Sequence, residues 1–428
     1  MSLSFLPRPA RSSLLSLLPR STCLSCSRRF VRKIASEALK SSKEPLTRCV
    51  LIKNLPPTFT VAKLLSLKGF GRPIESVIRR PSSNEVEICY LQPAGAACVV
   101  RAAKKGDFVM DGQKLKVEFC RPRPLPVEII AAVSLRPASR RLLLRLPKCF
   151  RTEKALEEEM QRFGEMEQMW MAEDGKKATV TFSDIATALK AGKTLRSEKA
   201  WADSNVTFYV QYKHIYPRDP QVYPHTVCLS HLDLAPYQLL SGLKDVLDWK
   251  MGEPLVCCSM NKNSAFLKFR DWDAAKIFYD TYNPPGRIQK SWANDETPIL
   301  SNQVTAAILG ASRTLSISNL DIQRIWSGRL REDFGKFGDV IRTFVELEHR
   351  RAVVEFADIM HACKAIDHIY NNGSDFSVYA GSKIGFWHRP RSGVTPPVFY
   401  LRPMEIGGST SQLVSKSNMS VESEVSYS

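Results

Sequence analysis

The side chains in this sequence that are best suited to chemistry are aromatic rings and basic groups. Phe266 and Lys268 alternate along one short apolar segment, and Tyr209 and Tyr212 stand among prolines and charged residues after another. An exposed ring can stack on a nucleic-acid base, and a lysine or arginine beside it can neutralise a phosphate. By contrast, the sequence contains no Walker loop, no GxSxG or HExxH motif and no paired-cysteine constellation. We therefore expect a chain that is not an enzyme and that needs neither a cofactor nor a metal.

The charge balance of the 428-residue chain indicates an anionic partner. Lys and Arg number 61 against 43 Asp and Glu, which gives a net charge of +18. An excess of this kind favours nucleic acid or an acidic membrane surface. No stretch approaches ~18 consecutive apolar residues, which excludes a membrane-spanning helix. We expect neither a membrane nor a small-molecule substrate as partner. The odd number of cysteines, 11, favours a reducing compartment.

The first 36 residues differ in composition from the rest of the chain. They contain seven basic residues, nine serines and no acidic residue. An Arg-rich, Ser-rich segment without acids is typical of a mitochondrial transit peptide. We therefore expect residues 1–45 to direct the protein to the mitochondrial matrix. The alternative interpretation is a disordered basic tail on a protein of the nucleus or cytoplasm.

Four segments of the chain repeat one pattern. Short apolar runs begin at residues 50, 142, 227 and 315, which are 92, 85 and 88 residues apart. Each run is followed by a helical stretch ending in glycine, as at Phe163-Gly164 and Phe337-Gly338, where glycine suits a left-handed helix C-terminus. A weak apolar run, an alternating apolar strand, an alanine-containing helix and a closing strand come next. The alternating strands cover 86–90, 178–182, 265–269 and 352–356.

This order of elements predicts the fold class. Strand-helix-strand-strand-helix-strand is the split βαβ arrangement of the α+β class. We expect tandem ferredoxin-like βαββαβ domains, each an antiparallel four-stranded sheet with two helices on one face, between disordered termini.

The same residues resemble the RNA recognition motif (RRM) family in four degenerate tandem copies. The short first-strand motif of that family is an apolar run ending in Asn-Leu, which Lys53-Asn54-Leu55 and Ser318-Asn319-Leu320 keep. The longer third-strand motif ends in an aromatic residue, which here is Tyr90, Phe182, Phe269 and Phe356. We expect these four rings to pack in the domain cores.

The repeat and the resemblance together predict the domain boundaries. The RRM-like copies span 46–121, 139–212, 224–297 and 312–388. The segments between them are a basic, proline-containing linker at 122–138, a Tyr/Pro linker at 213–223 and a third linker at 298–311. The Ser-rich residues 389–428 are expected to be a disordered tail.

The resemblance implies single-stranded RNA as the partner and indicates which sheet face would contact it. Side chains alternate along a strand, so the residues between the core positions of each third strand face outward. The expected outward sets are Glu85, Glu87 and Cys89; Lys177, Thr179 and Thr181; Ser264, Phe266 and Lys268; and Arg351, Val353 and Glu355. Typical members carry stacking rings there, whereas only Phe266 does so here. Glu85 and Glu87 would repel phosphates, so the four faces are not expected to work equally.

Basic groups near these faces complete the candidate RNA-binding set. Arg140, Arg141 and Arg145 continue the basic linker and could follow a phosphate backbone. The alternative interpretation of this basic run is a solvated surface. For Tyr209 and Tyr212 the alternative is packing against the domain. The whole set is Lys53, Asn54, Arg140, Arg141, Arg145, Lys177, Thr179, Tyr209, Tyr212, Phe266, Lys268 and Arg351.

Three functions fit these observations. The first is a multi-domain RNA-binding protein that acts on mitochondrial transcripts, in stability, processing or translation, through four weak modules whose linkage raises their affinity. The second is a protein-interaction scaffold of RRM-like domains within a ribonucleoprotein or beside mitoribosome proteins. The third is an mRNA-binding protein of the nucleus or cytoplasm.

Overall fold

The alternating apolar pattern builds the same antiparallel four-stranded sheet four times, in the order second–third–first–fourth strand. A computed structural model describes residues 47–67, 70, 73–80, 83–106, 108–202, 204–209, 226–234, 238–240, 242–243, 255–261, 263–270, 272–293 and 301–387. All of them belong to one compact unit that begins at Thr47. The expected transit peptide at 1–45 and the expected tail at 389–428 lie outside the described residues.

We number the four folded segments as modules 1 to 4. The strands of module 1 are β1 (Cys49–Lys53), β2 (Ile74–Arg80), β3 (Glu85–Tyr90) and β6 (Lys116–Phe119). Those of module 2 are β7 (Arg141–Arg145), β8 (Met166–Met171), β9 (Lys177–Phe182) and β10 (Val206–Phe208). Those of module 3 are β11 (Thr226–Ser230), β12 (Leu255–Asn261), β13 (Ser264–Phe269) and β14 (Gln289–Trp292). Those of module 4 are β15 (Thr314–Ser318), β16 (Val340–Glu346), β17 (Arg351–Phe356) and β18 (Lys383–Phe386).

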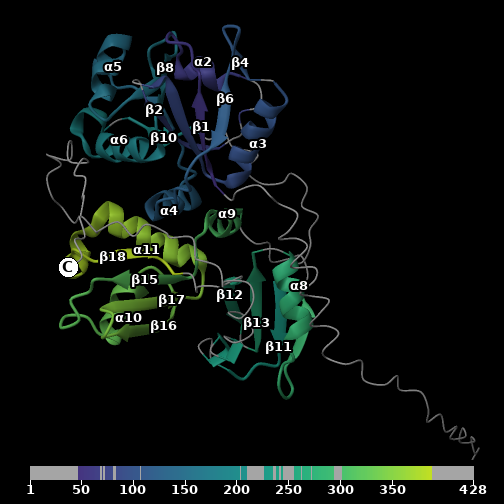
Figure 1. Cartoon of the computed structure of the whole chain (residues 1–428). Coiled ribbons are helices and arrows are strands. Elements are labelled where there is room, and N and C mark those ends of the chain that lie inside the picture. The colour runs from purple at the N-terminus through teal and green to yellow at the C-terminus, as the bar shows by residue number, and fades with distance from the viewer. Residues whose placement is uncertain are drawn as a thin grey trace, which may run out of the picture. The chain divides into compact units, whose positions relative to one another are not determined.

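Helices cover one face of each sheet, as the order of elements predicts. Module 1 has α2 (Val61–Leu65), α3 (Pro93–Lys104) and a small hairpin of β4 (Val109–Met110) and β5 (Gln113–Lys114). Module 2 has α5 (Glu153–Gln161) and α6 (Ile185–Ser197), module 3 has α8 (Trp272–Thr281), and module 4 has α10 (Ser327–Gly335) and α11 (Ile359–Asn372). Figure 1 shows α11 along β15, β17 and β18, and α8 beside β11 and β13. The predicted fold class is therefore confirmed.

The core of each module lies between the helices and the inner face of its sheet. The aromatic residues that end the third strands, Tyr90, Phe182, Phe269 and Phe356, are fully buried, which confirms that they are packing residues. Burying one large apolar side chain contributes about 1.5–3 kcal/mol. This contribution explains why a ring recurs at this position although the surrounding sequence is degenerate.

Residues with positive φ set the chain reversals after the strands and helices. Asn54, His231 and Asn319 follow the first strands of modules 1, 3 and 4 with φ of 63°, 60° and 60°. Asparagine tolerates this left-handed conformation better than most residues, which explains the Asn-Leu ending of two of the runs. Gly338 has φ of 148°, and a Cβ there would lie 2.2 Å from the ring of His361. The predicted glycine is needed at this helix end because its φ is positive and because no Cβ would fit beside His361.

Two segments expected to be linkers are in fact helices. Within 122–138, α4 (Val127–Leu135) buries Ile129, Ile130 and Ala131 almost completely. Within 298–311, α9 (Ser301–Leu309) contacts both α4 and α11. The prolines before α4 suggest an extended segment, but VEIIAAVSL is apolar on nearly every side, and such a helix is stable only when buried. It packs into the core shared by modules 2 and 4.

Modules 1 and 2 meet in the same way as modules 3 and 4. The amide of Val77 in β2 donates to the carbonyl of Ser183 at 2.8 Å, and that of Cys258 in β12 donates to Ala357 at 2.9 Å. In both pairs an isolated bridge adjoins this bond, between Ser76 and Asp184 and between Cys257 and Asp358. The chain thus repeats a two-module unit, in which the second strand of one module docks on the loop after the third strand of the next.

No helix in the described part of the chain combines the length and the apolar content needed to cross a membrane.

Replacing Ile130 by alanine tests whether α4 is part of the core. Because Ile130 is fully buried, Ile130→Ala should cost about 2–4 kcal/mol and lower the midpoint of urea unfolding followed by far-UV circular dichroism. Ile308→Ala, at an exposed position of α9, should leave the midpoint unchanged. Equal, small effects of both changes would mean that α4 is only a linker.

Candidate nucleic-acid interface

One row of side chains crosses the middle of the outer face of every sheet. The pairing registers give its members in the spatial order second, third, first and fourth strand. They are Ile78, Glu87, Leu51 and Glu118 in module 1; Trp170, Thr179, Leu143 and Thr207 in module 2; Ser259, Phe266, Cys228 and Ser291 in module 3; and Phe344, Val353, Ser316 and Gly385 in module 4. We call these the central rows. Three of the four central rows contain one aromatic ring.

The three rings occupy different strands. Phe266 lies on the third strand of module 3, as the sequence predicts, and is half-buried. Trp170 and Phe344 lie on the second strands of modules 2 and 4 and are 56% and 52% exposed. A large ring left this exposed on a sheet contributes little to the core, so it is available for stacking.

Trp170 and Phe344 were not predicted, because the faces of the second strands cannot be assigned by simple alternation. Each of these strands has a β-bulge, between Met166 and Gln168 and between Val340 and Arg342. The extra residue shifts the alternation, so counting from one end of the strand assigns the wrong face. Aligning the second strands of the four repeats would have placed both rings at one position.

Module 2 surrounds its ring with basic groups. Arg145 and Lys177 form a cross-strand pair at one end of the outer face, and both are exposed. At the other end, Arg141 donates to the Thr181 hydroxyl at 3.0 Å, and its guanidinium lies 5.3 Å from the ring centre of Tyr209. Among the described residues none of these three cations forms an ion pair with a carboxylate, although Arg141 acts electrostatically on Glu167. They can therefore attract a polyanion.

A cleft adjoins this face of module 2. Its volume is about 300 Å³, and it is lined by Arg141, Gln168 and Thr181 together with Leu65, Ser66 and Phe70 from the region of α2. The ion pair of Arg140 and Glu167 also lines the cleft, so in the part of the chain that the structure describes Arg141 is its one lining cation that is not paired there. The size of the cleft suits a planar base.

Arg140, in contrast, is not available for phosphate. Its guanidinium forms an ion pair with Glu167, the bulge residue of β8, and donates to the Phe182 carbonyl at 3.2 Å. Arg48 repeats the arrangement in module 1, with Glu75 at 3.1 Å and the Tyr90 carbonyl at 2.9 Å. Arg140 was expected to bind RNA, but its side chain is only 11% exposed and holds the bulge against the third strand.

Modules 3 and 4 are less basic than module 2. In module 4, Arg351 pairs with Glu346 at 2.7 Å and Arg342 pairs with Glu355 at 3.2 Å, so these charges are largely neutralised. In module 3, Lys268 lies beside Phe266 on the outer face and is half-buried. Each of these faces therefore offers one ring with a smaller positive field.

The chain itself covers the outer face of module 1 around Glu87 and Cys89. The residues after β6 cross it, because Arg123 reaches Glu87 at 3.1 Å while its carbonyl accepts from Arg48 at 2.6 Å. Glu87 and Cys89, both expected to be outward and exposed, are buried. Two arginines neutralise Glu87, the other being Arg80 at 2.8 Å, so it does not repel phosphates as predicted.

Four predicted residues remain, namely Lys53, Asn54, Thr179 and Tyr212. Lys53 pairs with Glu118 at 3.0 Å, and hydrogen bonds from Lys116 and Lys53 lower the pKa of that carboxylate. Asn54 is exposed and serves the turn described above. Thr179 is half-buried in the central row of module 2. Tyr212 lies outside the described residues.

Comparisons with known proteins add a limited likeness. No family model matches the chain. A stretch of 162 residues is 30% identical to the meiotically up-regulated gene 24 protein of Schizosaccharomyces pombe, covering 38% of this chain and 24% of that protein. This chain thus spans about a quarter of the length of that curated relative.

Among solved structures, the N-terminal three RNA-binding domains of the yeast splicing factor Prp24 match over 58% of this chain and 100% of theirs, with 16% identity and a TM-score of 0.20. RNA recognition domains 1 and 2 of Sex-lethal from Drosophila melanogaster match over 38% of this chain and 100% of theirs, with 18% identity and a TM-score of 0.16. The fold itself is established by the strand order of the chain.

Replacing Arg80 and Arg123 together tests whether they stabilise the buried carboxylate of Glu87. In Arg80→Ala/Arg123→Ala the buried carboxylate loses its partners, which should cost on the order of 3 kcal/mol and lower the thermal unfolding midpoint. The matched control is Lys53→Ala/Lys116→Ala, which removes both lysine partners of the more exposed Glu118 in the same sheet. It should lower the free energy of unfolding by less than about 1 kcal/mol. If the arginine variant cost no more than this control, Glu87 would be solvated and the outer face of module 1 would be open there.

Proposed function

We propose that this chain binds single-stranded RNA on the outer sheet faces of modules 2, 3 and 4. The observation that carries the proposal is the ring in each of their central rows, Trp170, Phe266 and Phe344. Stacking on such a ring stabilises binding by about 1–3 kcal/mol per base and tolerates any sequence. We propose RNA as the ligand because the repeats resemble the RRM family. Single-stranded DNA is the control ligand for this choice.

Module 2 is the strongest of the three sites in this proposal. It has the most exposed ring, the cations of Arg141, Arg145 and Lys177, and the adjoining cleft. Each phosphate that a cation neutralises releases counterions, so its affinity should fall steeply with salt. Modules 3 and 4 add one stacking site each.

Linkage of these sites explains how degenerate modules can act together. The second module of each pair is held to the first by backbone hydrogen bonds, and α4 and α9 contact each other. A strand bound by one face is then presented to the next at a high effective concentration. Several weak contacts can thus give one useful affinity.

A change at Trp170 tests the proposal. Trp170→Ala should weaken binding of a single-stranded RNA by about 5- to 150-fold, the equivalent of the stacking energy of one base, measured by fluorescence anisotropy on the full chain. Trp326→Ala is the matched control, because Trp326 is also exposed but precedes α10 and lies off the sheet face. It should change the affinity by less than about twofold.

Other results of that measurement would favour the second function. If neither Trp170→Ala nor Phe266→Ala/Lys268→Ala changed RNA affinity, the outer faces would not be the RNA site. The burial of Glu87 and Cys89 on the outer face of module 1 supports this alternative, because those side chains cannot contact RNA. A scaffold within a ribonucleoprotein or beside mitoribosome proteins would then be the better account.

We further propose that the protein acts in the mitochondrial matrix, on the stability, processing or translation of mitochondrial transcripts. The composition of residues 1–45 supports this location, since basic residues and serines are frequent and the first acid is Glu37. A fluorescent protein carrying these residues should accumulate in mitochondria. The same fusion with Arg8, Arg11 and Arg20 replaced by alanine should not. Diffuse or nuclear signal from the unaltered fusion would contradict the proposal and favour an mRNA-binding role elsewhere.

A further inference from the structure

Three cysteines from three parts of module 1 meet on the covered outer face of its sheet. Cys49 of β1 lies directly opposite Cys89 of β3. Cys120 follows β6, and its amide donates to the Cys49 carbonyl at 3.1 Å. The three residues therefore stand side by side across adjacent strands, although 40 and 31 residues separate them along the chain.

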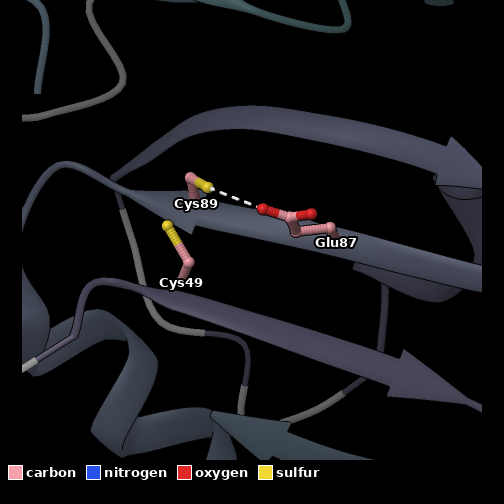
Figure 2. A group of neighbouring side chains, drawn as sticks. All are labelled: Cys49, Glu87 and Cys89. Atoms are coloured by element: carbon pink, nitrogen blue, oxygen red, sulfur yellow. Dashed lines mark hydrogen bonds between the residues drawn. The ribbon is translucent and has the colours of Figure 1, made fainter. Parts of the chain in front are cut away.

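A carboxylate completes this cluster. Figure 2 shows the Cys49 side chain pointing toward Cys89, and the Cys89 sulfur pointing toward the carboxylate of Glu87 on the same strand. One potential ligand atom from each of these residues lies within 4.8 Å of the others, and the Cys89 sulfur is 3.8 Å from Oε1 of Glu87. Cys49 therefore lies between Cys89 on one side and Cys120 on the other.

We propose that Cys49, Cys89, Cys120 and Glu87 bind one zinc ion. Thiolate and carboxylate are ligands that Zn²⁺ accepts in tetrahedral structural sites, and thiolates select it over calcium and magnesium. With zinc–sulfur bonds of about 2.3 Å, ligand sulfurs in such a site lie about 3.8 Å apart. The ligand atoms of Cys49, Cys89 and Glu87 already lie within 4.8 Å of one another. Cys120, which neighbours Cys49 on the other side of β1, would turn its side chain to supply the fourth ligand.

The charges around the cluster suit an anionic zinc centre. Three thiolates and one carboxylate leave two negative charges after Zn²⁺ is bound. The guanidiniums of Arg80 and Arg123 contact Glu87 at 2.8 and 3.1 Å, and Arg48 acts electrostatically on both Cys49 and Cys89. Arginines that hold a ligating carboxylate fix its orientation and raise metal affinity.

Protons balance the binding step. A thiol keeps its proton until a metal displaces it. On binding, each of the three sulfurs exchanges its proton for a bond to zinc, and Glu87 uses an oxygen lone pair. Three protons pass to solvent, and no atom is oxidised or reduced.

The site would have a structural role that differs from the proposed RNA binding. Zinc would tie β1, β3 and the chain after β6 together on a face that no RNA could then occupy. Cys120 is the most exposed of the three cysteines, which leaves a path for the metal to reach the cluster.

Metal analysis of the full chain tests the site. After incubation with Zn²⁺ and gel filtration, inductively coupled plasma mass spectrometry should find one zinc per chain. With Co²⁺ instead, a thiolate-to-cobalt charge-transfer band and tetrahedral d–d bands should appear. Cys49→Ser, Cys89→Ser and Cys120→Ser should each lose the bands and the zinc.

Matched controls separate this site from other cysteines. Cys98→Ser, at an exposed position of the same module, and Cys23→Ser/Cys26→Ser, at the one CxxC of the chain, should keep both signals. Zinc absent from the unaltered chain, or retained by Cys49→Ser/Cys89→Ser, would overturn the proposal. So would an intact mass two hydrogens lower, because a disulfide would then join two of the thiols. RNA affinity is a separate measurement, so either proposal can fail alone.

Discussion

The alternation of side chains across each antiparallel sheet is the constraint on which the rest of the structure depends. Apolar residues on one face pack against the helices and supply the free energy of folding, and a buried ring at the end of the third strand anchors each core. The residues of the opposite face are not needed for that purpose. They are free to diverge, and their differences distinguish the four modules.

Divergence of the outer faces follows from what covers them. In module 1 the chain after β6 crosses the sheet, so Glu87 becomes part of a buried ionic cluster. In module 2 the outer face stays open and combines Trp170 with unneutralised cations. Module 4 has a comparable ring, Phe344, but its arginines are paired with glutamates. One fold thus carries surfaces of different electrostatic character in a single chain.

Much of the fold was predictable from the sequence because it depends on local periodicity. The four alternating strands, the terminal rings and the glycine at 338 are all set by residues close together in the chain. The helix α4 was not predicted, because the prolines before Val127 suggested an extended segment and the partner that buries the helix lies more than 200 residues away.

The candidate site was predictable only where a strand has no irregularity. Phe266 and Lys268 lie on a regular third strand, and their face could be assigned by counting. Trp170 and Phe344 lie beyond bulges, which shift the alternation by one residue. The ion pair of Arg140 and the burial of Cys89 depend on partners that are distant in sequence, such as Glu167 and Cys49. No local pattern contains that information.

The central claim is that RNA lies on the outer faces of modules 2 to 4 and avoids that of module 1. Ultraviolet crosslinking of the full chain to a single-stranded RNA, followed by mass spectrometry of the peptides, reports this directly. Nucleotide adducts should occur on the peptides containing Trp170, Phe266 and Phe344, and not on β3 of module 1. Adducts confined to helices, or concentrated on residues 85–90, would contradict the account.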